Sequence, residues 1–306
     1  MTPAASKPRL PRYSRAAISP PMTLTDRDEE IIQWVAQLRF ASQDQIQRLL
    51  FSPAAASACK RRLSLLYHNG YLDRRYLPLR SAFGSARALY CLDRRGYDLL
   101  TFRYPEAHWH WRAKDNDREL YFLEHFAATN DVRVCFTLAA RSESFELQWT
   151  DERTLRAAVG RRTGRPMPGP DAGNLRSEQN NPPAIPDGAF TLVDEDFSWG
   201  FAVELDRGNV EEKPFRQKID ALLSYWRSGD YKASLGERQL RVLFVTTPTG
   251  RDPKRLERMK QWTERQGGKG LFWFTTSTAL RPTTALWEPI WLVAGRDGRY
   301  PLFRSS

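Results

Sequence analysis

Three carboxylates in the second half of the chain could hold a divalent metal ion. Asp187 follows Pro186 at the start of one strand-like segment, and Glu204 ends the next. If these segments form a hairpin, the two carboxylates meet at one end of a sheet. Alternation along a strand places Asp206 on the same face as Glu204. Because Mg²⁺ prefers oxygen ligands, the three acids predict a magnesium site that could activate water against a scissile phosphate.

A lysine follows these acids on the next predicted helix. Lys218 comes three residues after Phe215 and four before Leu222, so it flanks the apolar side of that helix. A lysine in such a position usually has a partner. Lys218 could therefore supply a cation to the acidic site. Ordinary surface ion pairs at Asp206 and a snorkelling lysine would produce the same pattern.

A second group of candidate functional residues is basic. The chain has a formal net charge of +11, and residues 51–95 contain nine basic residues against two acidic ones. Residues 1–22 add four basic residues and no acid, so the remainder of the chain is neutral overall. Charge concentrated in this way predicts a polyanionic partner, double-stranded DNA in particular. The alternatives are a solvated charged face and a surface used only for protein contacts.

Predicted helices and strands place these basic residues on a DNA-binding motif. Capping residues and apolar spacing predict helices over 26–38, 42–50 and 53–68, and strands over 71–77 and 86–92. Three helices followed by a hairpin are typical of a winged helix-turn-helix, whose third helix enters the major groove while the hairpin forms the wing. The DNA-binding residues predicted from this model are Lys60, Arg61, Arg62, Arg74, Arg75, Arg80 and Arg87.

The acidic site requires a different set of elements. Apolar patterning predicts helices over 117–141, 211–227 and 253–266, and strands over 145–150, 189–193, 200–205, 240–246 and 271–274. Residues 160–183, rich in Gly, Pro and Asn, are predicted to be a loop. We therefore expect an α+β protein with a disordered basic tail over 1–22, a winged helix domain over 23–112 and a mixed α/β domain over 113–306.

Composition limits where the protein is expected to reside and which metal or redox sites it could form. No stretch has the roughly 20 apolar residues of a membrane span and the N-terminus has no signal-peptide core, so we expect a cytoplasmic protein with no membrane partner. Cys59, Cys91 and Cys135 are too far apart for a metal or redox motif and are expected to be buried thiols. His108 and His110 alone do not make a zinc site.

Residues 24–275 resemble the replication-relaxation family of plasmids and other mobile genetic elements, which joins a winged helix to a nuclease-like core. The resemblance lies in segment 24–100, in His125 with Asn130–Val132, in Pro186-Asp187, and in 203–208 followed by Lys218. The second half also resembles the PD-(D/E)xK nucleases, with Asp187 and Glu204 at the two acidic positions. This likeness implies a restriction-endonuclease-like core.

The resemblance implies two alternative functions. The first is a Mg²⁺-dependent DNA endonuclease with Asp187, Glu204 and Lys218 as catalytic residues and Asp187, Glu204 and Asp206 as metal ligands. The second is a non-catalytic DNA-binding accessory factor that works with replication or mobilisation proteins. Asp206 stands where the nuclease pattern has lysine. Catalysis would therefore need Lys218 to replace that lysine, or Asp206 to hold a second metal ion.

Overall fold

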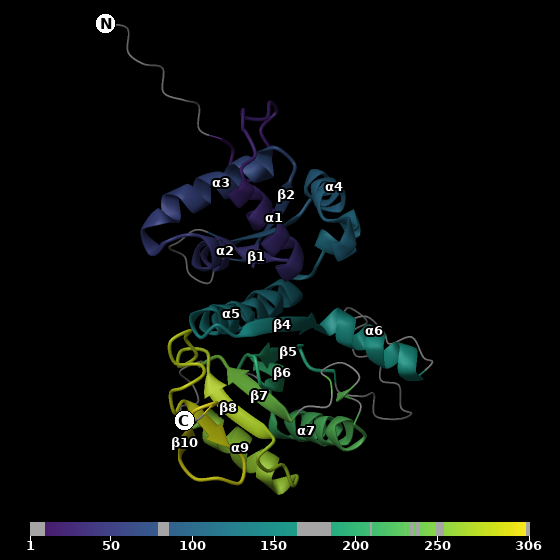
Figure 1. The fold of residues 1–306 in the computed structure, drawn as a ribbon, viewed down its shortest axis with the longest axis vertical. Coiled ribbons are helices and arrows are strands. Elements are labelled where there is room, and N and C mark those ends of the chain that lie inside the picture. Colours follow the sequence, from purple (N-terminus) through teal and green to yellow (C-terminus); the bar gives the residue numbers. More distant parts are fainter. Residues whose placement is uncertain are drawn as a thin grey trace, which may run out of the picture. The chain divides into compact units, whose positions relative to one another are not determined.

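The computed structural model describes residues 10–78, 86–163, 185–208, 210–229, 231–232, 236, 239–248 and 254–303. The chain divides into two compact units, unit 1 up to Asp131 and unit 2 from Val132 (Figure 1). The division falls within helix α5 (Leu120–Ser142), C-terminal to the predicted domain boundary at 112/113. Each unit contains one sheet and a hydrophobic core of its own, and the protein is a mixed α+β structure.

Three helices open unit 1, and their ends agree with the local sequence signals. They are α1 (Asp26–Leu38), α2 (Gln43–Leu50) and α3 (Ala56–His68), the last preceded by a 3-10 turn at Pro53–Ala55. Thr25 and Ser42 begin α1 and α2 through capping boxes. Gly70, just after α3, has φ 77°, a backbone region that favours glycine. The predicted helices over 26–38, 42–50 and 53–68 are confirmed.

A three-stranded antiparallel sheet completes the first part of unit 1. Its strands are β1 (Ala41–Ser42), β2 (Leu72–Tyr76) and β3 (Ala88–Leu92), in the order β1-β3-β2. Helix α4 (Arg94–Arg103) follows, capped by Asp93. Apolar residues at helical spacing on α1, such as Ile31 and Val35, are buried with Leu63 of α3 and Leu89 of β3. The two predicted hairpin strands are thus confirmed, with slightly shorter bounds.

Residues 10–22, part of the segment 1–22 for which a disordered tail was predicted, form hydrogen bonds with the rest of unit 1. The Ala16 N–H donates to Nδ1 of His68 at 3.0 Å, and Ser19 Oγ donates to the His68 carbonyl at 3.1 Å. The Asn69 side chain donates to the Pro20 carbonyl at 3.0 Å. Polar groups just after α3 and on its last turn therefore hold the segment. Residues 1–9 lie outside the described residues.

Unit 2 is built on a seven-stranded mixed sheet in the order β10-β9-β8-β7-β6-β5-β4. Strands β6, β7 and β8 are parallel, and the remaining pairs are antiparallel. The strands are β4 (Glu146–Asp151), β5 (Gly188–Val193), β6 (Ser198–Asp206), β7 (Leu240–Thr246), β8 (Phe272–Thr276), β9 (Trp291–Val293) and β10 (Arg299–Tyr300).

Helices cover both faces of this sheet. Residues of α5 such as Phe136 pack with Phe201 and Val203 of β6 on one face. On the other face, α6 (Glu152–Thr163), α7 (Glu212–Arg227) and α9 (Arg255–Arg265) pack against Ala202 of β6 and Phe244 of β7. Alternate residues of β6 therefore point to opposite layers, as the period of a strand requires. Among the helices the structure describes, none is both long and apolar enough to cross a membrane.

Three elements that the structure describes in unit 2 were not predicted. Helix α6 covers 152–163, whose C-terminal end overlaps the predicted loop over 160–183, and residues 164–183 of that loop lie outside the described residues. Strands β9 and β10 are three and two residues long. Runs this short carry no detectable alternation, so they are defined only by pairing, of β9 with β8 and of β10 with β9.

Candidate functional site

Glu204 and Lys218 form an ion pair at the centre of the predicted acidic site. Glu204, on β6, has a fully buried side chain, whereas the Lys218 side chain on α7 is 38% exposed. Burial of Lys218 would lower its pKa, but Glu204, Asp187 and Glu152 outweigh burial and raise that pKa above its ordinary value. Lys218 is therefore charged at neutral pH and lies within the field of three carboxylates.

Asp187 lies at the same end of the sheet. The β5–β6 register pairs Gly188 with Val203, so the next position brings Asp187 beside Glu204 on the face that α7 covers. The Asp187 carboxylate accepts a hydrogen bond from the Leu205 N–H at 2.7 Å. This hydrogen bond fixes the carboxylate at the end of the hairpin. The structure thus brings Asp187, Glu204 and Lys218 together, while their catalytic role stays a prediction.

Asp206 shares this face, but its carboxylate is bound by a different cation. Arg255, the first residue of α9, donates to both Asp206 oxygens, at 2.7 Å from Nη2 to Oδ1. Thr246 Oγ1 donates to the same carboxylate at 2.6 Å. Asp206 and Arg255 are both buried. A guanidinium therefore lies where the predicted role of Asp206 as a metal ligand requires a metal ion, so that role, which stays a prediction, would need Arg255 to move away.

The remaining acids fit a metal ion only in part. Within the described ranges, no group of three or more His, Cys, Asp or Glu side chains is placed to hold one. Asp187 and Glu204 are a pair of carboxylates, and Mg²⁺ is commonly held by one or two carboxylates together with waters and phosphate oxygens. The pair fits such an ion provided that the Lys218 ammonium moves away from Glu204.

The basic residues of α3 divide into an exposed pair and a half-buried arginine. Lys60 and Arg61 are exposed. Arg62 turns inward, where Nε donates to Oδ1 of the fully buried Asp28 at 2.7 Å and Nη2 donates to the Thr23 carbonyl at 3.1 Å. Arg62 therefore ties α3 to the N-terminal turn of α1, and Lys60 and Arg61 remain on the surface that a partner could reach.

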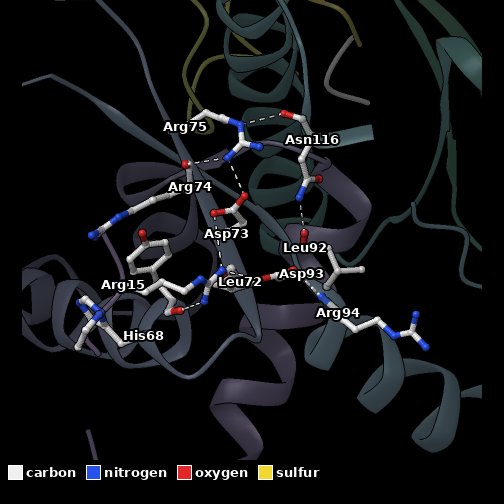
Figure 2. Close-up of polar contacts among 12 residues, drawn as sticks. Arg15, His68, Leu72, Asp73, Arg74, Arg75, Leu92, Asp93, Arg94 and Asn116 are labelled. Atoms are coloured by element: carbon white, nitrogen blue, oxygen red, sulfur yellow. Dashed lines mark hydrogen bonds and ion pairs between the residues drawn. The ribbon is translucent and has the colours of Figure 1, made fainter. Parts of the chain in front are cut away.

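The arginines of β2 also have partners within unit 1 (Figure 2). Arg75 donates to Asp73 at 2.6 Å and to the Asn116 carbonyl at 3.1 Å. The Arg74 guanidinium lies over the Tyr67 ring, 3.7 Å from its centroid, and donates to the Arg12 carbonyl. Arg74 and Arg75, two of the predicted wing residues, therefore hold neighbouring segments of unit 1 in place.

Two further residues of the predicted wing remain. Arg87 is exposed and donates through Nη2 to Ser42 Oγ at 2.9 Å. Arg80 lies outside the described residues. Lys60, Arg61 and Arg87 are thus the predicted DNA-binding residues that the structure leaves exposed.

Sequence reasoning missed two arginines that matter here. Arg255 neutralises Asp206, and Arg15 donates to Asp93 and to the Leu72 carbonyl at 3.1 Å. A buried acid needs a cationic partner, so Asp206 on a buried strand indicated that one existed. Nothing local to residue 255 identifies it as that partner, because only the packing of α9 on the sheet brings the two together.

Comparison with known proteins identifies one family. The family model described as replication-relaxation matches residues 32–239. No curated protein matches the chain.

Two solved structures of the restriction endonuclease FokI show a distant likeness. The DNA-bound form shares 12% identity at a TM-score of 0.26 and covers 85% of this chain. The form described without DNA shares 11% at the same score and covers 83%. The chain spans less than half the length of either structure, 45% and 43%. A TM-score this low does not establish a shared fold.

Proposed function

The chain belongs to the replication-relaxation family, and from this membership we propose that it is a DNA-binding protein of replication whose unit 1 binds duplex DNA as a winged helix. The observation that carries the proposal is the exposure of Lys60 and Arg61 on α3. In this reading α3 enters the major groove, and the β2–β3 hairpin forms the wing. Replication or mobilisation proteins of a plasmid or similar element would be its partners.

The contacts within unit 1 narrow which residues would meet DNA. Arg62, Arg74 and Arg75 hold internal segments, so they would support the surface instead of forming it. Lys60, Arg61 and the exposed Arg87 can reach phosphates without breaking an ion pair. Phosphate contacts position a protein on the duplex, and each releases counterions.

The test is duplex binding by the double variant Lys60→Ala/Arg61→Ala, followed by fluorescence anisotropy at several salt concentrations. If both residues contact phosphates, the variant binds more weakly. The slope of log K against log salt also becomes shallower by about 0.9 for each lost contact.

A matched control removes two exposed positive charges elsewhere on unit 1, with Arg94→Ala/Lys114→Ala. The control should change duplex affinity much less than the α3 variant. Equal losses in the two double variants would mean that only net charge matters, and would reject α3 as the recognition helix.

A second candidate function is metal-dependent cleavage of DNA, favoured by the convergence of Asp187, Glu204 and Lys218. Asp187 and Glu204 would hold Mg²⁺, which would supply a Lewis acid and a water of lowered pKa. Lys218 would leave Glu204 and stabilise negative charge on the phosphate. Asp206 would take no part, because Arg255 holds its carboxylate.

Two measurements test this candidate separately. An ion that binds the folded site stabilises the protein by mass action, about 2.7 kcal/mol at a hundred times its Kd. Thermal unfolding with Mg²⁺ or Mn²⁺ should therefore show a higher Tm for wild type, and Asp187→Asn and Glu204→Gln should abolish the increase. Supercoiled plasmid should be cut by wild type and not by these variants or Lys218→Ala.

A control variant is Glu152→Gln, which changes the charge near Lys218 without removing a proposed ligand. It should keep both the metal-dependent increase and the cleavage. Wild type with neither a metal-dependent Tm shift nor cleavage of any DNA form would leave the non-catalytic DNA-binding protein as the function.

A further inference from the structure

Unit 2 has a large surface groove at the end of the sheet opposite Glu204. The groove has a volume of about 1140 Å³, and its walls include Trp199 near the start of β6, Arg241 on β7 and Trp273 on β8. Glu204 lies five residues beyond Trp199 along β6, or about 16 Å for an extended strand. The groove is therefore separate from the acidic site.

Aromatic side chains make up much of the groove wall, and two of them present open faces. Phe197 is 64% exposed and Trp226 is 42% exposed. Trp199 packs against Phe303, with ring centroids 4.7 Å apart, and Phe197 lies beside Trp199 at 5.9 Å between centroids. Single exposed aromatic rings are ordinary, but these two line the same groove, and such grouping is typical of a binding site. Phe197 and Trp226 are thus available to stack on a planar ligand.

Within the described part of the groove lining, the charged side chains are almost all cationic. Five basic residues line it: Arg227, Lys232, Arg241, Lys269 and Arg296. Among the lining residues that the structure describes, the single acid is Asp194, whose carboxylate accepts from the N–H groups of Asp196 and Phe197 at 3.0 and 2.6 Å. Among the described residues, Arg227, Lys269 and Arg296 have no ion-pair partner. The groove therefore complements an anion.

A polyanion with planar groups satisfies both features of the wall. In duplex DNA the bases stack on each other and offer only their edges in the grooves. In a single strand each base can leave the stack and lie on an aromatic ring, while basic residues follow the phosphates. A cavity of this volume also suits bases and sugars one at a time.

We propose that this groove binds single-stranded DNA, with Phe197 and Trp226 stacking on bases and Arg227, Lys269 and Arg296 contacting phosphates. The choice of DNA over RNA rests on the proposed function in replication. The site itself goes beyond that function, because it lies on unit 2 and not on α3. A replication protein with both surfaces could hold duplex and unpaired DNA at the same time.

The test uses the full chain and a fluorescein-labelled oligodeoxythymidylate of about 16 nucleotides, at the upper end of the site sizes of single-strand-binding folds. Wild type should bind it, with quenching of tryptophan fluorescence. Removing one stacking ring should weaken binding about tenfold, so Phe197→Ala/Trp226→Ala should lose about a hundredfold. Lys269→Ala/Arg296→Ala should weaken binding and flatten its salt dependence.

The control is Phe102→Ala, which removes an 82% exposed ring from α4 of unit 1 and should leave single-strand binding unchanged. Duplex binding should survive Phe197→Ala/Trp226→Ala, and single-strand binding should survive Lys60→Ala/Arg61→Ala. These variants therefore distinguish failure of the single-strand proposal for the groove from failure of the duplex-binding proposal for α3. Unchanged oligodeoxythymidylate affinity in the aromatic double variant, or tighter binding of oligouridylate than of oligodeoxythymidylate, would overturn the proposal.

Discussion

At the scale of single residues, buried carboxylates pair with some of the basic side chains. Only the other basic side chains stay exposed, where a partner could bind them. Asp28 is fully buried and takes Arg62, and Asp206 is buried and takes Arg255. Burying a carboxylate without a cationic partner costs free energy, so each of these acids binds an arginine. That arginine is then not available on the surface. Neighbouring arginines in the sequence can therefore have opposite roles.

Arg61 and Arg62 provide the sharpest case. Arg62→Ala leaves Asp28 buried without its guanidinium, so we expect a loss of about 3 kcal/mol in the free energy of unfolding. Arg61→Ala removes an exposed side chain and should change that free energy by no more than about 0.5 kcal/mol. Urea denaturation followed by circular dichroism measures both.

The two variants should affect duplex binding in the opposite order, when binding is measured on protein that is still folded. Arg61→Ala should weaken binding through a lost phosphate contact, and folded Arg62→Ala should bind nearly as well as wild type. Equal stability of the two variants would mean that Arg62 does not hold Asp28 in solution.

At the scale of elements, the segment 10–22 acts as a strap along α3 and β2. His68, buried at the end of α3, accepts from the Ala16 N–H through Nδ1 and lies near Arg15 and Arg74 (Figure 2). Burial, Arg74 and Arg15 lower the pKa of His68 from its ordinary 6.5. Neutral histidine is therefore the form that holds the strap, because protonated Nδ1 cannot accept a hydrogen bond.

Acid should loosen this strap. Because the folded-state pKa of His68 is below 6.5, its contribution to stability is complete above that pH and is lost as pH falls through the lowered pKa. Hydrogen exchange of residues 10–22, corrected for the intrinsic rate, should increase between about pH 7.5 and about pH 5. His68→Gln cannot titrate and should exchange at a rate that no longer depends on pH in this range.

His110→Gln serves as the control, because His110 is exposed and outside this network. It should keep the pH dependence of wild type. Protection of residues 10–22 that stays constant with pH in wild type would show that His68 does not control the strap.

At the scale of the whole molecule, each unit contains cysteine thiols that are buried from solvent. Cys59 and Cys91 are buried in unit 1, and Cys135 is buried in unit 2. Burial raises the pKa of Cys59 to about 12 and also raises the pKa of Cys91. The thiolate is the reactive form, so native thiols should be unreactive.

Ellman's reagent should therefore find no fast thiol in the native protein and three in denaturant. A variant that keeps only Cys135 should report the opening of unit 2, and one that keeps Cys59 and Cys91 should report unit 1. Fast, stoichiometric reaction of any thiol at neutral pH in native protein would contradict the burial of that residue.

Local sequence signals determined most of the elements. The capping boxes at Thr25 and Ser42, Gly70 after α3 and the apolar spacing of α1 each act within one or two turns of the chain. The hairpin that joins Asp187 to Glu204 also followed from alternation along neighbouring strands. The family resemblance, confirmed over residues 32–239, came from the same segments.

Tertiary structure alone decided which side chains meet. Arg255 reaches Asp206 because α9 packs on the sheet, and Arg62 reaches Asp28 because α3 crosses α1. The aromatic and cationic groove joins residues from β6, α7 and the turn before β10, which no local pattern relates. Charge partners and grooves depend on distances between elements, whereas composition counts every arginine alike. The sequence therefore predicted a basic, DNA-binding unit 1, and only the packing showed which cations remain on its surface.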